Sequence, residues 1–312
     1  MSGPTLTSLR EAHAGLVGVA DRTPLLPLPG ERAVRLKAEW RQPIGAFKIR
    51  GAWTAVSRLP DADRARGVVT SSSGNHGLGV AYAAQRHGIP CVVVMPESAP
   101  AVKVAGVREL GGEVMLVGAT RGPEQTSRAE QLVVERGLTF IPPYDHLDVI
   151  TGQGTCGLEI LEDWPEVGTL VVPVGGGGLL AGICAAVQAF RPDVRVIAVE
   201  PHGVPKLSAA RMAGHPVDLA GGTSLADGLL TRSVGTLTWP IIAQTVREVA
   251  AVTDDEIQTA MRYLASQGFK VEPSGAVTTA AWLAGRVSGT DAVALVATGG
   301  NVDPARYQAL VG

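Results

Sequence analysis

The segment at residues 45–52, GAFKIRGA, places a single lysine, Lys48, between an aromatic residue and an arginine, with glycine on either side. Such a lysine can be a surface charge, a phosphate contact or an amine for covalent chemistry. Glycine lets the backbone approach a ligand closely, because it carries no side chain. Burial near other cationic groups would lower the pKa of the amine and make it a nucleophile. The segment alone leaves the three alternatives open.

The segment at residues 171–182, VVPVGGGGLLAG, is the strongest phosphate-binding signal in the chain. Four glycines, Gly175, Gly176, Gly177 and Gly178, follow an apolar strand pattern and open an alanine-rich helix. The N–H groups at a helix N-terminus bind anions, and glycine permits close approach. A turn without a ligand is the alternative, but a turn needs fewer glycines. The run contains no GxxxxGK[ST] and fits the dinucleotide pattern poorly, so the identity of the phosphate stays open.

The segment at residues 70–77, TSSSGNHG, is a second turn between a strand and a helix. Its hydroxyl, amide and N–H groups suit an anion such as a carboxylate, and we predict that the turn as a whole binds one. The predicted members are Ser72, Ser73, Gly74, Asn75 and His76. The alternative is that Ser72 or Ser73 merely caps the helix and that His76 is a partly solvated residue of its first turn. For His76 taken alone, we favour that alternative.

A third turn, ATGGN at residues 297–301, ends the last strand pattern with the hydroxyl of Thr298. By itself it is equally a plain turn. Taken together, however, the chain offers a lysine, a phosphate-binding turn, a carboxylate-binding turn and a hydroxyl at a strand end. Pyridoxal phosphate needs these groups, because its aldehyde forms an imine with lysine and its phosphate anchors the ring. We therefore predict pyridoxal 5'-phosphate as the cofactor and Lys48 as its imine lysine.

The elements that must position these residues alternate between strand and helix. Short β-branched or apolar runs, each followed by a turn and a helical run, recur between residues 67 and 142, and the pattern restarts near residue 151. This alternation predicts right-handed βαβ units and parallel sheets. The predicted fold class is α/β, with two doubly wound open domains and a ligand in the crevice between them. We assign residues 1–60 and 147–312 to a large cofactor-phosphate domain and residues 61–146 to a small substrate-binding domain.

The composition excludes several classes of partner. The 312 residues are 46% hydrophobic and 18% charged, and the net charge of −2 argues against binding to nucleic acid. No apolar stretch long enough to span a membrane is present, and the N-terminus lacks the apolar core of an export signal. Cys91, Cys156 and Cys184 each lie in an apolar context, typical of buried thiols in a reducing compartment. We predict a cytoplasmic enzyme with neither membrane nor nucleic-acid partners.

These motifs, in their order, resemble the pyridoxal-phosphate enzymes of fold type II, which have the tryptophan synthase β-like fold. The resemblance is to the branch that holds threonine/serine dehydratases and serine racemase. It covers nearly the whole chain through RTPLL, GAFKIRGA, SSGNHG, GQGT, PVGGGGLLAG, VEP, ADG, TWPII, VTDDEI, VEPSGA and GGN. The combination of FKIRGA, SSGNHG and GGGGL is highly specific, whereas each of them alone is a weak signal.

The resemblance implies a role for each matching residue. Lys48 resembles the imine lysine, which also moves the α-proton on one face of the substrate, and Phe47 flanks it. Asn75 resembles the residue that bonds the ring oxygen of the cofactor. Residues Gly175 to Gly178 and Leu179 match the phosphate loop, and the turn from Ser72 to His76 matches the loop that grips the substrate carboxylate. Asp227 and Glu272 match positions near the cofactor, with helix-capping carboxylates as the alternative.

Two hydroxyl groups bear on the type of reaction. Thr298 matches the residue that faces the pyridine nitrogen, where a neutral hydroxyl cannot keep that nitrogen protonated as a carboxylate would. This favours β-elimination over transamination. Ser73 matches the serine that acts as acid and base on the face opposite Lys48 in racemase-like members. The alternative is that Ser73 only caps a helix.

Three positions depart from the family pattern. Ala46 replaces the usual serine before the phenylalanine, and Tyr144 favours a dehydratase over a racemase. The divalent-metal site of eukaryotic-type serine racemases would use Glu200 and a carboxylate six residues later, but that position is Lys206. An ammonium paired with Glu200 would replace the cation, so we predict no metal. The alternative is two solvated charges without contact.

The resulting function is a lyase that removes water and ammonia from a β-hydroxy amino acid of the threonine/serine type and releases a 2-oxo acid. Serine, threonine, 3-hydroxyaspartate and phenylserine all fit, and the sequence does not choose between them. A serine or aspartate racemase that uses Lys48 and Ser73 is the main alternative. A Rossmann-type nucleotide-binding oxidoreductase and a non-catalytic binder of pyridoxal phosphate are alternatives of other classes. By family analogy we expect a homodimer and a small amino-acid substrate.

Overall fold

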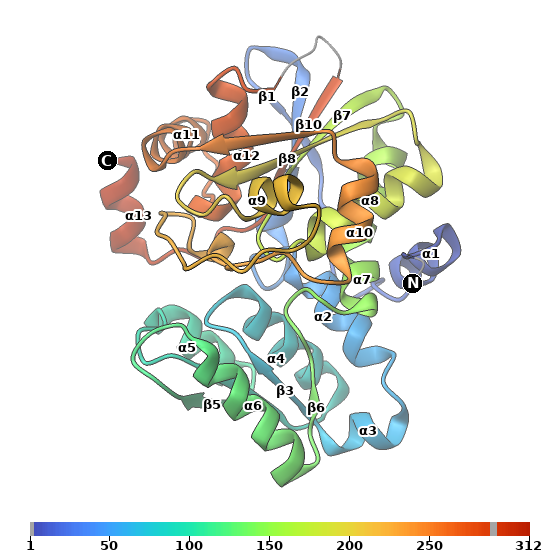
Figure 1. Cartoon of the computed structure of the whole chain (residues 1–312), viewed down its shortest axis with the longest axis vertical. Coiled ribbons are helices and arrows are strands. Elements are labelled where there is room, and N and C mark those ends of the chain that lie inside the picture. Colours follow the sequence, from blue (N-terminus) through green and yellow to red (C-terminus); the bar gives the residue numbers. More distant parts are fainter. Residues whose placement is uncertain (1–2, 288–291) are drawn as a thin grey trace.

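The computed structural model describes residues 3–287 and 292–312, which form two bodies, each built around a sheet (Figure 1). The upper body in that view contains a six-stranded sheet of order β1-β2-β10-β7-β8-β9. The lower body contains a four-stranded sheet of order β5-β4-β3-β6. Both are flanked by helices, which confirms the predicted α/β class.

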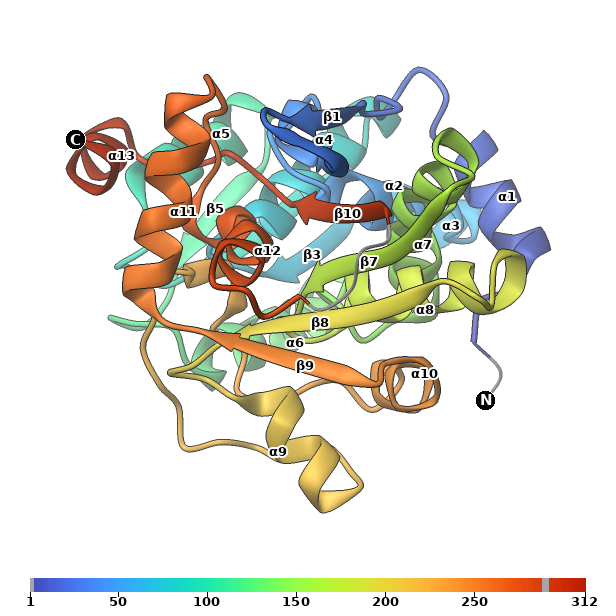
Figure 2. The ribbon, with the colours of Figure 1, turned by 90° about the horizontal axis from the view of Figure 1, so that it is seen from above.

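The strands of the large sheet come from both ends of the chain and lie side by side in Figure 2. They are β1 (Leu25–Leu28), β2 (Glu31–Ala38), β7 (Val167–Pro173), β8 (Arg195–Pro201), β9 (Glu248–Val252) and β10 (Ala292–Ala297). All pairs are parallel except β1 with β2, which form an antiparallel hairpin. The hairpin turns through Gly30, whose φ of 84° is a left-handed conformation that suits glycine.

Helices cover both faces of this sheet. One face carries α1 (Leu6–Ala14), α7 (Leu147–Asp163), α8 (Gly178–Phe190), α9 (Lys206–Ala213) and α10 (Thr238–Thr245). The other face carries α11 (Asp254–Ser266), α12 (Pro273–Leu283) and α13 (Pro304–Val311). Alternate residues of β7 point to the two faces, because Val172 packs in the first apolar core and Val171 in the second. Short 3-10 helices η1 (Glu39–Arg41) and η2 (Asp227–Leu229) lie between these elements.

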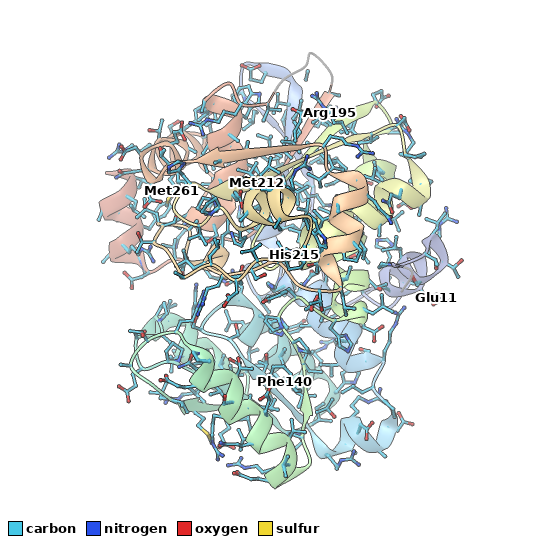
Figure 3. The ribbon with its side chains drawn as sticks, viewed as in Figure 1. Glu11, Phe140, Arg195, Met212, His215 and Met261 are labelled. Atoms are coloured by element: carbon cyan, nitrogen blue, oxygen red, sulfur yellow. The ribbon has the colours of Figure 1, made fainter. Side chains whose placement is uncertain are left out.

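The small sheet is entirely parallel and repeats the layered arrangement. Its strands are β3 (Val68–Ser71), β4 (Cys91–Met95), β5 (Glu113–Leu116) and β6 (Thr139–Phe140). The accompanying helices are α3 (Asp61–Arg66), α4 (Asn75–His87), α5 (Ala101–Glu109) and α6 (Pro123–Arg136). Figure 3 marks the two bodies by Phe140 in the lower one and Met261, buried in α11, in the upper one.

Helix α2 (Lys48–Ser57) lies at the junction of the two bodies (Figure 1). Its residues Ile49, Ala52 and Val56 pack in the apolar core of the small sheet, while the helix also packs against α7. Helix α2 therefore contributes to both bodies. The predicted boundaries between the large and the small domain, near residues 60 and 147, stay a prediction.

A buried ion network fixes α2, and with it Lys48. Arg50 donates to Glu39 at 2.8 Å and to Glu159 at 2.7 Å, and Lys37 donates to Glu159 at 2.6 Å. All four side chains are at most 2% exposed. Two positive charges balance two negative ones, as buried ions require. The network ties α2 to β2, η1 and α7.

Two further predictions concern the state of the cysteines and the absence of a membrane span. The cysteines are free and buried, and burial raises the pKa of the Cys91 and Cys184 thiols to about 12. They therefore lie in the apolar surroundings that the sequence predicts. Within residues 3–287 and 292–312, no helix is both long enough and apolar enough to cross a bilayer.

Candidate active site

A cavity of about 280 Å³ lies between the two sheets and is lined by both bodies. All the site residues proposed from the sequence line it, although they come from distant parts of the chain. They are Phe47, Lys48, Ser72, Ser73, Gly74, Asn75, His76, Gly175, Gly176, Gly177, Gly178, Leu179 and Thr298. The fold thus brings the three turns and the lysine together at the carboxyl ends of strands β3, β7 and β10.

Lys48 is the first residue of α2, and the backbone before it is bonded to the end of β10. The N–H of Phe47 donates to the carbonyl of Thr298, and the N–H of Gly300 donates to that of Gly45, both at 3.0 Å. The half-buried Lys48 places its Nζ 2.6 Å from the carbonyl oxygen of Pro143, to which it donates. Burial lowers the pKa of Lys48 to about 8, so the amine becomes nucleophilic near neutral pH.

The tetraglycine turn joins β7 to α8, and close packing explains its composition. A Cβ on Gly176 would overlap the ring of Tyr144, and one on Gly178 would lie 3.1 Å from the Tyr144 backbone. Gly177 has a φ of 96°, in the left-handed region. Tyr144 is therefore part of the site, and the N-terminus of α8 presents its unpaired N–H groups to the cavity.

The structure corrects the capping alternative for the serine turn. Gly74, not a serine, is the N-cap of α4, and no side-chain capping bond is made there. The Ser73 hydroxyl instead accepts from Nη2 of Arg121 at 2.6 Å. The hydroxyl of Ser72 accepts from the Gly74 N–H at 3.3 Å.

His76 is buried rather than partly solvated, with 2% of its surface exposed. Its Nε2 donates to the carbonyl of Ile141 at 3.1 Å, which leaves Nδ1 as an unpaired acceptor among the described residues. Burial, and secondarily the charge of Lys48, lowers the pKa of His76 to about 3. The imidazole is therefore neutral at physiological pH.

Asn75 is held by partners from the large body. Its Nδ2 donates to Oε1 of Glu272 at 2.7 Å, and its Oδ1 accepts from Nδ2 of Asn301 at 2.9 Å. The second N–H of the amide remains for a ligand. Burial raises the pKa of Glu272 to about 7, and its carboxylate makes no capping bond at the start of α12. Glu272 lines the cavity and is thus a site residue rather than a cap.

Two cavity cations, Lys103 and Arg121, have no distinguishing signal in the sequence. Lys103 donates to the carboxylate of Asp227 at 3.2 Å, and Arg121 donates to the backbone carbonyl of the same residue at 3.2 Å. Asp227 lies on η2 of the large body, so both cations reach it across the cavity. The glycines at 118 and 122 mark only a loop there.

The site fits pyridoxal phosphate on the chemistry of its donors. It combines a lysine of lowered pKa, a helix N-terminus free of side chains and a free amide N–H on Asn75. The hydroxyl of Thr298, 4% exposed, lies at the end of β10 with only a long bond of 3.4 Å to the carbonyl of Ser274. The buried hydroxyl of Thr231 also lines the cavity and has no partner within residues 3–287 and 292–312.

Glu200 and Lys206 are neighbours but are not bonded as the sequence suggested. The Glu200 carboxylate accepts from the N–H groups of Leu207 and Ser208, at 2.7 and 3.0 Å, at the start of α9. The Lys206 ammonium donates to the carbonyls of Val174 and Val204, at 3.2 and 3.1 Å. Both side chains are fully buried, which rules out two solvated charges. In the described part of the chain, no group of three or more His, Cys, Asp and Glu residues could hold a metal.

Comparisons with known proteins identify the family to which the chain is similar. The family model described as pyridoxal-phosphate dependent enzyme matches residues 18–299. The L-threonine ammonia-lyase of Thermotoga maritima is 40% identical over 305 residues, which are 96% of this chain and 76% of that protein. The serine racemase of Oryza sativa subsp. indica is 37% identical over 95% of this chain and 90% of its own length.

A solved structure extends the similarity to three dimensions. The structure of maize serine racemase superimposes with a TM-score of 0.94 at 35% identity, over 99% of this chain and 97% of that one. The chain belongs to the family of pyridoxal-phosphate-dependent enzymes, in its fold type II branch.

Proposed function

We propose that this enzyme is a dehydratase (an ammonia-lyase) that converts a β-hydroxy amino acid of the threonine/serine type into a 2-oxo acid and ammonia. The observation that carries the proposal is the single cavity shared by Lys48, the serine turn and the tetraglycine turn. A Rossmann-type oxidoreductase would leave Lys48 and the serine turn without a role.

Pyridoxal phosphate, when bound, withdraws electrons from the substrate's Cα and so acidifies the α-proton. Lys48 would hold the cofactor covalently, and the N-terminus of α8 would bind its phosphate. The free N–H of Asn75 would donate to the ring oxygen. The hydroxyl of Thr298 would face the pyridine nitrogen, where its neutrality favours elimination over transamination.

The residues of the chain then orient and deprotonate the substrate. The N-terminus of α4 and the hydroxyl of Ser72 bind the substrate carboxylate. The amine of Lys48, neutral above its pKa of about 8, takes the α-proton. Loss of the β-hydroxyl as water leaves an enamino acid, which water converts to the 2-oxo acid and ammonia.

Racemisation is the second candidate, and one contact favours it. The Ser73 hydroxyl accepts from the guanidinium of Arg121 at 2.6 Å, and a cation at that distance stabilises the deprotonated hydroxyl. Ser73 can then exchange a proton with Cα on the face opposite Lys48. Similarity to both a threonine ammonia-lyase and serine racemases supports keeping elimination and racemisation as the two candidate activities.

A substrate panel tests the proposal. L and D enantiomers of serine, threonine, 3-hydroxyaspartate and phenylserine are assayed for release of a 2-oxo acid and for inversion at Cα. We expect elimination from at least one L substrate. Release of no 2-oxo acid from any of them would contradict the dehydratase.

The variant Ser73→Ala separates the two activities. It is expected to keep elimination from the L substrate and to abolish racemisation, because only the second face loses its acid and base. Ser127→Ala, an exposed serine on α6, is the matched control. Racemisation that persists in Ser73→Ala would show that Ser73 is not the acid and base on the face opposite Lys48.

Three further features are proposed, the first from the family resemblance, the second from the apolar surroundings of the cysteines, and the third from Lys206, which stands where the resemblance would place a metal-binding carboxylate. We infer a homodimer, a cytoplasmic location and a reaction that needs no divalent metal. The last is supported by the ammonium of Lys206, which lies where it satisfies two buried carbonyls.

A further inference from the structure

Arg121 lines the cavity with a positively charged side chain that is also exposed to solvent. Its Nη2 donates to the Ser73 hydroxyl at 2.6 Å and its Nη1 to the backbone carbonyl of Asp227 at 3.2 Å, both of them neutral acceptors. Among the described residues, no carboxylate forms an ion pair with it. A guanidinium has five N–H donors, so three remain for a ligand.

The neighbouring carboxylates do not neutralise this charge. The nearer one, on Asp227, accepts from Lys103 at 3.2 Å and forms a balanced pair with it. Glu272 accepts from Asn75, and its pKa of about 7 leaves it partly protonated at neutral pH. With Lys48 engaged by the cofactor, one positive charge at the substrate end of the cavity has no counterpart.

The loop at residues 117–122 holds Arg121 at the cavity wall. The buried side chain of Gln125 accepts from the Gly122 N–H at 2.7 Å and donates to the carbonyls of Val117 and Thr120, at 2.5 and 3.1 Å. Gly118 turns the loop with a φ of 70°. The backbone at Arg121 is thus held in place beside the serine turn. A residue that determines substrate specificity needs such a fixed position.

The small body lines this part of the cavity with polar groups. Besides the serine turn, it contributes Ser71, Thr126 and Gln125, against the apolar Val94 and Pro96. A threonine methyl would offer the exposed Arg121 guanidinium no partner, and its charge would stay in contact with water. A second carboxylate on the substrate would pair with it, because a guanidinium matches the planar geometry of a carboxylate.

We propose that Arg121 binds a carboxylate on the substrate's side chain, and that the enzyme prefers a β-hydroxy dicarboxylic amino acid such as 3-hydroxyaspartate. This inference rests on the proposed dehydratase function and specifies its substrate class. The serine turn and the N-terminus of α4 account for the α-carboxylate, so the Arg121 charge matches a second one. Loss of the β-hydroxyl as water, followed by hydrolysis, would convert 3-hydroxyaspartate to oxaloacetate and ammonia.

The test compares two substrates that differ at the side chain, 3-hydroxyaspartate and threonine. Wild type, Arg121→Gln and Arg121→Lys are assayed for kcat/KM, with Arg136→Gln, an exposed arginine paired with Glu113, as control. We expect wild type to favour 3-hydroxyaspartate. Arg121→Gln should reduce this preference about 10- to 100-fold, since a charged hydrogen bond is lost, and Arg121→Lys should restore part of it.

An equal fall of kcat/KM for both substrates in Arg121→Gln would overturn the proposal, because it would place Arg121 on the α-carboxylate or on Ser73. A wild type that favours threonine would overturn it as well.

A binding measurement distinguishes this failure from failure of the proposed function. Succinate and butyrate differ by one carboxylate, and their binding to the holoenzyme is followed by the cofactor absorbance. Even if no substrate releases a 2-oxo acid, succinate should bind roughly tenfold more tightly than butyrate to wild type but not to Arg121→Gln. Equal binding of the two acids by wild type would overturn the proposal.

Discussion

The amine of Lys48 and the carboxyl of Glu272 line the same cavity, and burial moves both pKa values toward neutrality, to about 8 and about 7. Burial lowers the pKa of His76 to about 3, away from neutrality, so the imidazole stays uncharged. Lys103 and Asp227 form an ion pair across the same cavity at 3.2 Å. A pKa of about 8 lets the amine of Lys48 exchange a proton near neutral pH, as the proposed reaction requires of its base.

The raised pKa of Glu272 predicts how stability varies with pH. Between pH 4.5 and about 7 the folded chain holds more protons than the unfolded chain, so this group lowers the free energy of unfolding as pH rises through that window. Glu272→Gln removes the effect while keeping an acceptor for Asn75. The unfolding free energy of the variant, relative to wild type, should be higher at pH 8 than at pH 5 by about 1–3 kcal/mol.

Denaturant titration at the two pH values measures this difference. Glu109→Gln, which replaces an exposed glutamate on α5, is the control and should show no such change. The same relative stability of Glu272→Gln at both pH values would show that the Glu272 carboxyl is not held in its protonated form.

At the residue scale, the sequence predicts those groups that belong to a recognisable turn. Lys48, Asn75 and the serine turn follow from their own segments. Arg121 and Lys103 do not, because nothing local separates a cation that lines a cavity from one that faces solvent. Their functional surroundings arise only when Ser73 and Asp227 are brought to them by the fold.

At the scale of elements, the chemistry depends on the turn at the carboxyl end of each parallel strand. The carbonyl of Val174, at the end of β7, accepts from the buried ammonium of Lys206 at the start of α9. The next residue is Gly175, the first of the tetraglycine turn. Lys206 therefore ties the tetraglycine turn to the loop before α9.

Lys206→Met is expected to weaken both the fold and cofactor binding. It leaves the carbonyl of Val174 buried without its donor, whereas Val204 keeps the bond from the backbone N–H of residue 206; this should lower the free energy of unfolding by about 1–3 kcal/mol. The dissociation constant of pyridoxal phosphate should rise as well, because the turn loses its anchor. Thermal unfolding and cofactor titration measure the two effects.

Lys270→Met, at an exposed lysine, is the matched control for this variant. Dialysis of the wild-type enzyme against a chelator tests the proposed independence from a divalent metal. It should leave the activity unchanged. An unaltered cofactor affinity in Lys206→Met, or loss of wild-type activity on chelation, would contradict this role for the ammonium.

The elements that the sequence predicted correctly are those with a complete local pattern. The runs that form β4, β7 and β8 are apolar, and each is followed by a turn and a helix. The hairpin of β1 and β2 was not predicted, because an antiparallel edge strand that contains Pro27 lacks such a run. β6 is only two residues long, since its extent is set by pairing with β3 and not by its own residues.

At the scale of the whole molecule, the site exists only because two sheets face one cavity. Lys48, Thr298 and the tetraglycine turn come from the large body and its junction, and the serine turn comes from the small one. The amide of Asn75 bridges them through Glu272 and Asn301. The cofactor phosphate and the substrate carboxylate are thus expected to be held by different bodies.

The most direct measurement is to locate the covalently held cofactor. The chain has lysines at positions 37, 48, 103, 206 and 270, and three of them, Lys48, Lys103 and Lys206, lie at or near the cavity. Borohydride reduction of the holoenzyme, followed by peptide mapping, should find the cofactor on Lys48 alone. Lys48→Ala should retain no reduced cofactor and release no 2-oxo acid. Cofactor fixed to Lys103 or Lys206 instead, or a Lys48→Ala variant that still eliminates, would contradict the role assigned to Lys48.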